Sequence, residues 1–198
     1  MLDDKLEIKT LEEASNIVIY DENGKEIVFG DLFKNNKCIV IFIRHFLCTV
    51  CRDYCTDISK IPKYNINEAN SKLVIIGCAP WKFIKNFKED FNLEYEIYSD
   101  TDLNLYKKLG LMNNFIVNGG SMAHVKTNVI VGVLNSFYDF IKNGFEKQGD
   151  ISQLGGEFIF GPGNNIILVH RCKSIFDHIH INKLLNKIDA KEIDFDNN

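Results

Sequence analysis

The chain has 198 residues and a formal net charge of −4, and 45% of its residues are hydrophobic. This length and composition predict a globular domain that folds without disulfides, and they exclude a mainly disordered protein. The lysines fall singly or in pairs, which argues against a nucleic-acid surface. No apolar run approaches the ~20 residues of a membrane span. The opening residues (MLDDKLEIKTLEEA) lack a signal-peptide pattern, so we expect a cytoplasmic protein with free thiols.

The first elements along the chain are predicted to be a hairpin, a buried strand and a helix. Residues 16–20 and 25–29 flank the turn DENG, in which Asn-Gly supplies the positive φ angles of a tight hairpin. Residues 38–44 (CIVIFIR) form a continuous apolar run, which is typical of a strand buried on both faces. A helix is expected from about Thr49 to Lys60, with an interruption near Pro62.

The rest of the chain alternates between strand and helix patterns. The expected elements are strands at 73–77, 96–99, 157–160 and 166–170, a helix at 103–109 and a terminal amphipathic helix around 181–188. The side chains of Trp81, Ile84, Phe87 and Phe91 recur at helical spacing and are expected in the core.

This order of elements predicts an α/β fold. A thioredoxin-like, peroxiredoxin-type sandwich fits best, with a central mixed sheet and helices on both faces. One domain is expected over residues 1–198, with short extensions at about 1–15 and 190–198. The loop after the central strand then opens at the carboxyl edge of the sheet, where α/β folds bind their ligands.

The motif Cys48-Thr-Val-Cys51 lies at that edge, directly after the buried strand and at the start of a helix. In this context a C-x-x-C pair indicates redox chemistry rather than metal binding. The unpaired N–H groups and the positive dipole end of a helix start stabilise a thiolate, which is the reactive form of cysteine. Arg44 and Arg52 flank the pair and would add positive potential. His45 would do likewise or point into the core.

Two other interpretations of these cysteines stay open. Cys48, Cys51 and Cys55, together with His45, are candidate zinc ligands, although no second C-x-x-C or H-x-x-x-H pair accompanies them. The pair is alternatively a structural feature, because buried cysteine is common at small apolar positions.

The remaining thiols and imidazoles are expected to have structural roles. Cys38 is predicted to lie in the core, and Cys78 and Cys172 are predicted to be loop or strand-end thiols without a local partner. The side chains expected to be solvated or capping are His170, His178 and His180.

Four longer segments carry a family resemblance. They are RHFLCTVC, SMAHVKTNVIVG, QGDISQLGGEFIFGPGNNIILVHR and DHIHINKLL, all within about residues 16–189. They resemble the peroxiredoxin-like 2 family, which has an AhpC/TSA antioxidant-enzyme domain, and its C-type branch most closely. The resemblance implies a thioredoxin fold, a cytosolic location and thiol redox chemistry. In that family the B-type branch reduces prostaglandin-type endoperoxides through its C-x-x-C, whereas the C-type branch has no settled substrate.

The chain also departs from related patterns. Peroxiredoxins proper carry P-x-x-x-T-x-x-C, and here those positions hold Arg44, Cys48 and Cys51. That alignment makes Cys51 the attacking thiol, whereas alignment with thioredoxin makes Cys48 the attacking thiol and Cys51 the resolving one. We favour Cys48, because the first thiol of a helix start is the less buried. Gly155-Gly156 replace the cis-proline of thioredoxins, which would let a substrate backbone approach closely.

The sequence therefore predicts a thiol-dependent oxidoreductase that reduces a small hydroperoxide or endoperoxide. The expected catalytic residues are Cys48, Cys51 and Arg44, and the expected thiolate and substrate surroundings are His45, Arg52, Gly155 and Gly156. Electrons are expected from thioredoxin or glutathione, with no metal, flavin or other cofactor. The alternatives are a thiol-disulfide oxidoreductase and a redox-sensing protein without turnover.

Overall fold

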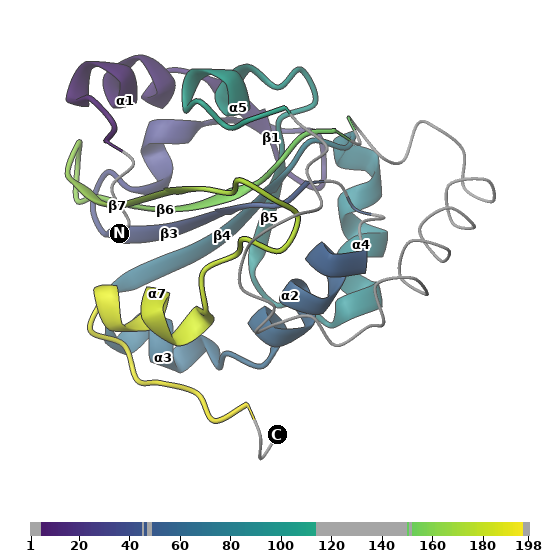
Figure 1. Cartoon of the computed structure of the whole chain (residues 1–198), viewed down its shortest axis with the longest axis vertical. Helices are drawn as coiled ribbons and strands as arrows, with labels where there is room; N and C mark the ends of the chain where they lie inside the picture. The colour runs from purple at the N-terminus through teal and green to yellow at the C-terminus, as the bar shows by residue number, and fades with distance from the viewer. Residues whose placement is uncertain (1–4, 45, 47–48, 114–149, 151, 196–198) are drawn as a thin grey trace.

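Within the part of the chain that the structure describes, seven strands form one mixed sheet in the order β2-β1-β5-β4-β3-β6-β7 (Figure 1). The computed structural model describes residues 5–44, 46, 49–113, 150 and 152–195. The strands are β1 Val18–Tyr20, β2 Glu26–Val28, β3 Lys37–Phe42, β4 Ser71–Gly77, β5 Glu96–Ser99, β6 Gly156–Phe160 and β7 Ile166–Arg171. Strand β3 runs parallel to β4 and antiparallel to β6, so the sheet is mixed, as the sequence predicts.

Helices cover both faces of this sheet. The helical elements are α1 Ile8–Ser15, η1 Phe29–Leu32, α2 Thr49–Ser59, α3 Lys63–Glu68, η2 Trp81–Phe83, α4 Ile84–Phe91, α5 Asn104–Lys108 and α7 Ile181–Lys187. Figure 1 shows α1 and α5 on one side of the sheet, and α2, α3, α4 and α7 on the other. No helix among the described residues is long and apolar enough to span a membrane.

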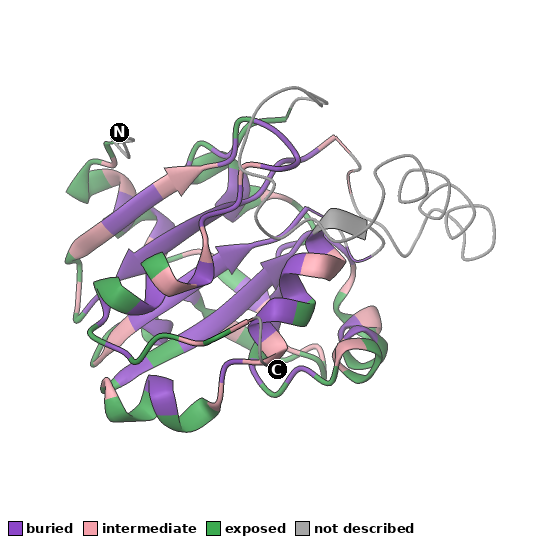
Figure 2. Cartoon of the chain, turned by 60° about the horizontal axis from the view of Figure 1, so that its bottom comes forward, coloured by how far each residue is buried: buried purple, intermediate pink, exposed green. Residues whose placement is uncertain are grey.

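Strand β3 divides the core into two layers, because successive side chains of a strand point to opposite faces. Its residues Ile39 and Ile41 pack in the cluster that holds the buried side chains of α2, α4 and α7. Val40 and Phe42 pack in the cluster beneath α1 and α5. Figure 2 shows the buried strands at the centre of the molecule. The predicted strand buried on both faces is therefore confirmed.

The predicted hairpin is confirmed as well. Strands β1 and β2 pair antiparallel, with Val18 opposite Val28, and Gly24 in the turn has a φ of 76°. Such a positive φ favours glycine, because other side chains clash in that conformation. The interruption near Pro62 is the boundary between α2 and α3.

Two expectations need correction. Trp81 is 40% exposed and not part of the core, because it precedes α4 in η2 and its ring lies against Gly24. Residues 8–15, assigned to an extension, form α1, whose Leu11 and Ala14 are completely buried. The segment SMAHVKTNVIVG lies outside the described residues.

Candidate active site

Helix α2 begins close to the end of β3, as the position of the C-x-x-C motif requires. Cys51 is the third residue of α2 and is completely buried. Phe46 anchors the preceding segment, because its ring stacks on Phe87 with centroids 4.6 Å apart and lies against Gly77 of β4. Cys48 and His45 lie outside the described residues. The structure thus places Cys51 in the first turn of the helix and leaves the geometry of the pair undescribed.

Arg44 is a buried cation at the carboxyl edge of the sheet. Its side chain is only 4% exposed, and its Nε donates to the carbonyl oxygen of Gln153 at 3.2 Å. The side chain of Gln153 is held in turn, because its amide donates to the carbonyls of Met112 and Leu154. Arg44 is therefore a buried, hydrogen-bonded residue that follows β3, and it is not a mobile surface arginine.

The other flanking arginine makes a different contact. Arg52 is half-buried, and its guanidinium carbon lies 5.0 Å from the ring centroid of Phe91 on α4. This cation–π contact holds Arg52 at the interface between α2 and α4. Its proposed influence on the thiolate stays a prediction.

Gly155 and Gly156 are both buried, and strand packing explains why neither carries a side chain. A Cβ on Gly155 would lie 2.0 Å from the carbonyl oxygen of Phe42, and one on Gly156 would lie 2.4 Å from that of His170. The chain's own backbone thus fills the space that we expected a substrate backbone to enter. The sequence did not indicate that the backbone at Gly155 and Gly156 must pack this closely against Phe42 and His170.

Two more thiols are buried and hard to ionise. Burial raises the pKa of Cys38 and of Cys78 to about 12. Cys38 lies in the core, as predicted. The prediction that Cys78 lacks a local partner is wrong, because its thiol donates to the carbonyl oxygen of Arg44 at 2.7 Å. Cys78 thus ties the end of β4 to the start of the motif loop.

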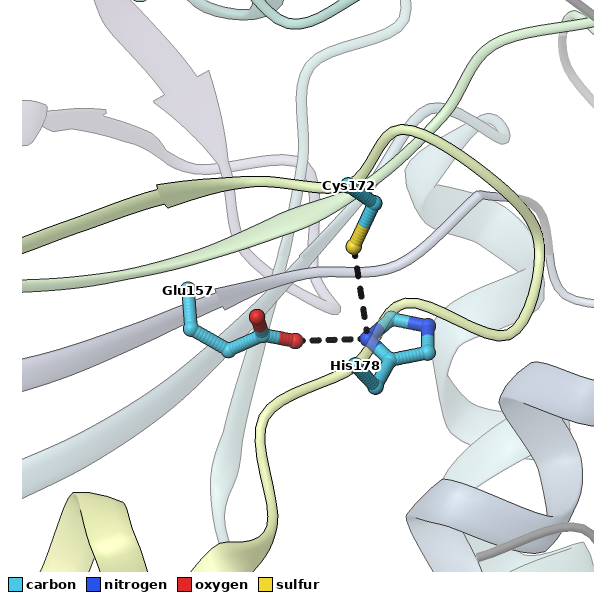
Figure 3. Close-up of side chains that lie close together, drawn as sticks. All are labelled: Glu157, Cys172 and His178. Atoms are coloured by element: carbon cyan, nitrogen blue, oxygen red, sulfur yellow. Dashed lines mark hydrogen bonds and ion pairs between the residues drawn. The ribbon is translucent and has the colours of Figure 1, made fainter. Parts of the chain in front are cut away.

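A buried polar cluster also lies beside α2 (Figure 3). The Nδ1 atom of His178 lies 2.5 Å from Oε1 of Glu157 and 3.8 Å from Sγ of Cys172. The Cys172 thiol also donates to the carbonyl oxygen of Asp177 at 3.3 Å. Burial is the main cause that raises the pKa of Cys172 well above its usual range, followed by the charge of Glu157.

This cluster corrects two expectations and confirms one. Cys172 has local partners, and His178 is buried where solvation or capping was expected. His180 caps α7, because its Nδ1 accepts from the backbone N–H of Asn182. Glu157 was missed because a single glutamate in an apolar strand gives no signal until its cross-strand neighbours are known.

Within the described residues, Glu157, Cys172 and His178 are also the one group whose donor atoms lie within 4.8 Å of one another. Structural zinc sites use four protein ligands, and here three donors are already hydrogen-bonded among themselves. We therefore interpret the group as a hydrogen-bonded cluster. The zinc interpretation of the C-x-x-C motif involves Cys48 and His45, which lie outside the described residues.

Comparisons with known proteins agree with this architecture. Residues 57–174 match the family model described as AhpC/TSA antioxidant enzyme. The human protein named Peroxiredoxin-like 2C is 36% identical over 186 residues, which is 93% of this chain and 82% of the human one. A Danio rerio protein named Prostamide/prostaglandin F synthase is 27% identical over 74% of this chain and 71% of its own length.

Solved structures show the same fold. The crystal structure of a Peroxiredoxin 6 of Arenicola marina has a TM-score of 0.62 at 15% identity, covering 88% of this chain and 69% of that one. A likeness at this identity concerns the fold alone, whereas the human relative is similar enough to show the family. The chain therefore belongs to the AhpC/TSA antioxidant enzyme family, as a peroxiredoxin-like 2 oxidoreductase with a thioredoxin-type fold.

Proposed function

We propose that this oxidoreductase reduces a small hydroperoxide or endoperoxide through the thiols of Cys48 and Cys51. The observation that carries the proposal is the position of Cys51, which is buried in the first turn of α2 at the carboxyl edge of the sheet. Helix starts stabilise thiolates, and the family is one of antioxidant enzymes.

The proposed cycle begins with attack of the Cys48 thiolate on one oxygen of the O–O bond. That bond breaks, the sulfur is oxidised to a sulfenic acid, and the other oxygen leaves as an alcohol after it takes a proton. Cys51 then displaces the sulfenic oxygen as water, which leaves a Cys48–Cys51 disulfide. Two electrons and two protons from thioredoxin or glutathione restore the thiols. The cycle calls for no metal or flavin.

Arg44 supports this chemistry through its charge. Its guanidinium is buried and held to Gln153, so its positive potential acts in surroundings that screen it less than water does. Arg44 precedes Thr49, the first residue of α2, by five positions along the chain, and a fixed cation close to the thiols would favour the thiolate over the thiol. We assign Arg44 to thiolate stabilisation.

Two observations support the proposed substrate class. The Danio rerio relative is named for prostaglandin chemistry, and its similarity extends over most of this chain. The glycines that replace the thioredoxin cis-proline are packed against Phe42 and His170, which removes a surface for binding an extended protein substrate. A small oxidised molecule therefore fits this chain better than a protein disulfide.

The experiment is a steady-state assay with hydrogen peroxide, alkyl hydroperoxides and a prostaglandin-type endoperoxide. Each is tested with thioredoxin and its reductase, and separately with glutathione. We expect turnover with at least one substrate, lost in Cys48→Ser and kept in the core variant Cys38→Ala. A single stoichiometric oxidation without turnover would instead identify a redox sensor, and turnover only on protein disulfides would identify a thiol-disulfide oxidoreductase.

A further inference from the structure

Strand β7 forms one edge of the sheet, and part of its backbone points away from its neighbour. Among the described strands β7 pairs with β6 alone. The backbone N–H of Cys172 donates to the carbonyl oxygen of Gly155, so the alternation of an antiparallel pair makes His170 and Leu168 the next residues that bond to β6. Val169 lies between them, and its N–H and C=O therefore point to the outer edge.

These outward groups of Val169 lie in dry surroundings. The residue is only 7% exposed, and within the described part of the chain its N–H and C=O have no hydrogen-bond partner. A buried backbone group without a partner costs free energy comparable to a lost hydrogen bond. A ligand that offers one donor and one acceptor at this edge would remove that cost.

A groove of about 670 Å³ lies along this edge, within the usual size range of ligand pockets. It is lined by residues 164–169 of β7 and the turn before it, by residues 5–8 leading into α1, and by Lys187 of α7. Strand β7 lies between α1 and α7, which cover opposite faces of the sheet (Figure 1). A segment bound in this groove would therefore lie in the plane of the sheet, beside β7.

The lining of the groove is apolar with a net positive charge. Ile8 is 60% exposed, and Leu6 is partly buried against the core cluster beneath α1 and α5. The charged side chains at the groove are two cations and one anion, namely Lys5, Lys187 and Glu7. This lining suits apolar side chains that are accompanied by a carboxylate.

A bulge in β7 limits the length of a bound segment. Ile159 pairs with Leu168 and Phe160 pairs with Ile166, so Ile167 is an extra residue that interrupts the regular pairing. The regular edge begins at Leu168. It suits a short added strand better than the long edge of another sheet.

We propose that the edge of β7 binds a short, extended, acidic segment of another protein, which joins the sheet as an added strand. Its backbone pairs with the N–H and C=O of Val169, and its side chains point alternately toward the α1 layer and the α7 layer. Its carboxylates face Lys5 and Lys187. This inference goes beyond the proposed function and does not depend on it.

A second copy of this chain is a poorer occupant of the groove. Its own β7 reads IILVHR, which contains no acidic residue. Pairing of two β7 edges would also bring the lysines of both grooves together, and like charges disfavour such a contact.

The first test uses a fluorescent, acetylated and amidated peptide of the sequence EVTVE, with fluorescence anisotropy to measure its binding to the full chain. We expect saturable binding that Lys187→Glu weakens by about fivefold or more at low salt. The control Lys85→Glu makes the same change of net charge at an exposed position of α4 and should stay within about twofold of wild type. An absence of binding, or an equal loss in both variants, would overturn the proposal.

The second test examines backbone pairing with two N-methylated forms of the same peptide. One form is methylated at both valines, and the other at the threonine and the last glutamate. Alternate N–H groups of an added strand point toward β7 and away from it. We expect one form to bind about tenfold more weakly and the other to bind as the parent peptide does. Equal effects of the two methylations would exclude an added strand.

The third test locates the site by amide hydrogen exchange followed by NMR. Without the peptide, the N–H of Val169 should exchange about tenfold faster than those of Leu168 and His170, which bond to β6, and the peptide should slow it. Slow exchange at Val169 in a free monomer would show that the chain itself covers the edge. Slow exchange together with a dimer in sedimentation would identify a second copy as the occupant. Either result, or no effect of the peptide on Val169, would overturn the proposal.

Discussion

The face of the sheet under α1 and α5 is packed with aromatic rings, whereas the face under α2 and α7 encloses a carboxylate and an imidazole. On the first face Phe160 contacts Phe29, Phe33 and Phe158, with centroids 5.2–6.1 Å apart. On the second face Glu157 lies opposite Ile41 and points into the layer that holds α2.

We interpret this difference as a division of roles between the two faces of the sheet, in which one face contributes mainly to stability and the other holds the polar groups. Aromatic packing gains free energy from buried area and ring contacts. A buried carboxylate costs free energy unless partners satisfy it, and here His178 and the Ile179 N–H do so. The face under α1 and α5 also has a buried carboxylate beside it, Asp100, but its partners are backbone N–H groups at the start of α5, whereas Glu157 contacts an ionisable side chain. The predictions below test whether the two faces separate in this way.

Substituting the thiols of the motif should have the largest effect on activity. We expect Cys48→Ser and Cys51→Ser to abolish turnover, and Cys38→Ala, on the aromatic face, to keep it. Because Cys48 is the proposed attacking thiol, Cys48→Ser should also abolish alkylation by iodoacetamide at about pH 6, while Cys51→Ser retains it. Peptide mapping of the alkylated protein checks this. Retained alkylation in Cys48→Ser would make Cys51 the attacking thiol.

Phe160→Ala should have the largest effect on stability. Phe160 is completely buried among three other rings, and its truncation leaves a cavity in the aromatic layer. We expect the free energy of unfolding to fall by about 3–5 kcal/mol. Urea denaturation measures that change, and the turnover per folded molecule should stay as in wild type. A matching loss of turnover would mean that the two faces are coupled.

Most of this fold could be predicted from local sequence patterns. The apolar run CIVIFIR predicts β3, and the Asn-Gly turn predicts the hairpin of β1 and β2. Both signals depend only on residues that are neighbours in the sequence. The exposure of Trp81 could not be predicted, because helical spacing does not show where a helix begins. The burial of α1 also depends on which side of the sheet remains uncovered, which is a tertiary property.

The site could be predicted only in part, and for a related reason. A C-x-x-C after a buried strand is a local signal, and it placed Cys51 correctly at the start of α2. The Glu157–His178 contact joins residues 21 positions apart in β6 and in the loop before α7. Nothing in either segment indicates that contact until the strand order is known. The reason for Gly155, a steric contact with β3, is equally non-local.

Tyr54→Phe, in the layer between α2 and the sheet, should have a smaller effect on the free energy of unfolding. The substitution keeps the ring that stacks on His178 and removes the hydroxyl that donates to the carbonyl oxygen of Ile179 at 2.7 Å. We expect a loss of about 1 kcal/mol in the free energy of unfolding, the usual worth of one buried hydrogen bond. Thermal unfolding measures it. A loss as large as that of Phe160→Ala would show that α2 depends on this bond for its attachment to the loop.

The buried thiol of Cys38 should have the smallest effect on the free energy of unfolding near neutral pH. Its effect should grow only in the alkaline range. In the unfolded chain a thiol ionises with a pKa of about 8.5, whereas burial raises the pKa of Cys38 in the folded protein to about 12. Between these two values the unfolded state loses a proton that the folded state keeps. The stability that Cys38 contributes is therefore complete below the lower value and declines as the pH rises through this window.

Urea denaturation of wild type and Cys38→Ala at about pH 7.5 and about pH 10 isolates this contribution, because the other alkaline groups are common to both proteins. The wild type should lose more stability than the variant on going to the higher pH. An equal loss would mean that the Cys38 thiol ionises in the folded protein, and that the aromatic face is less dry than its packing indicates.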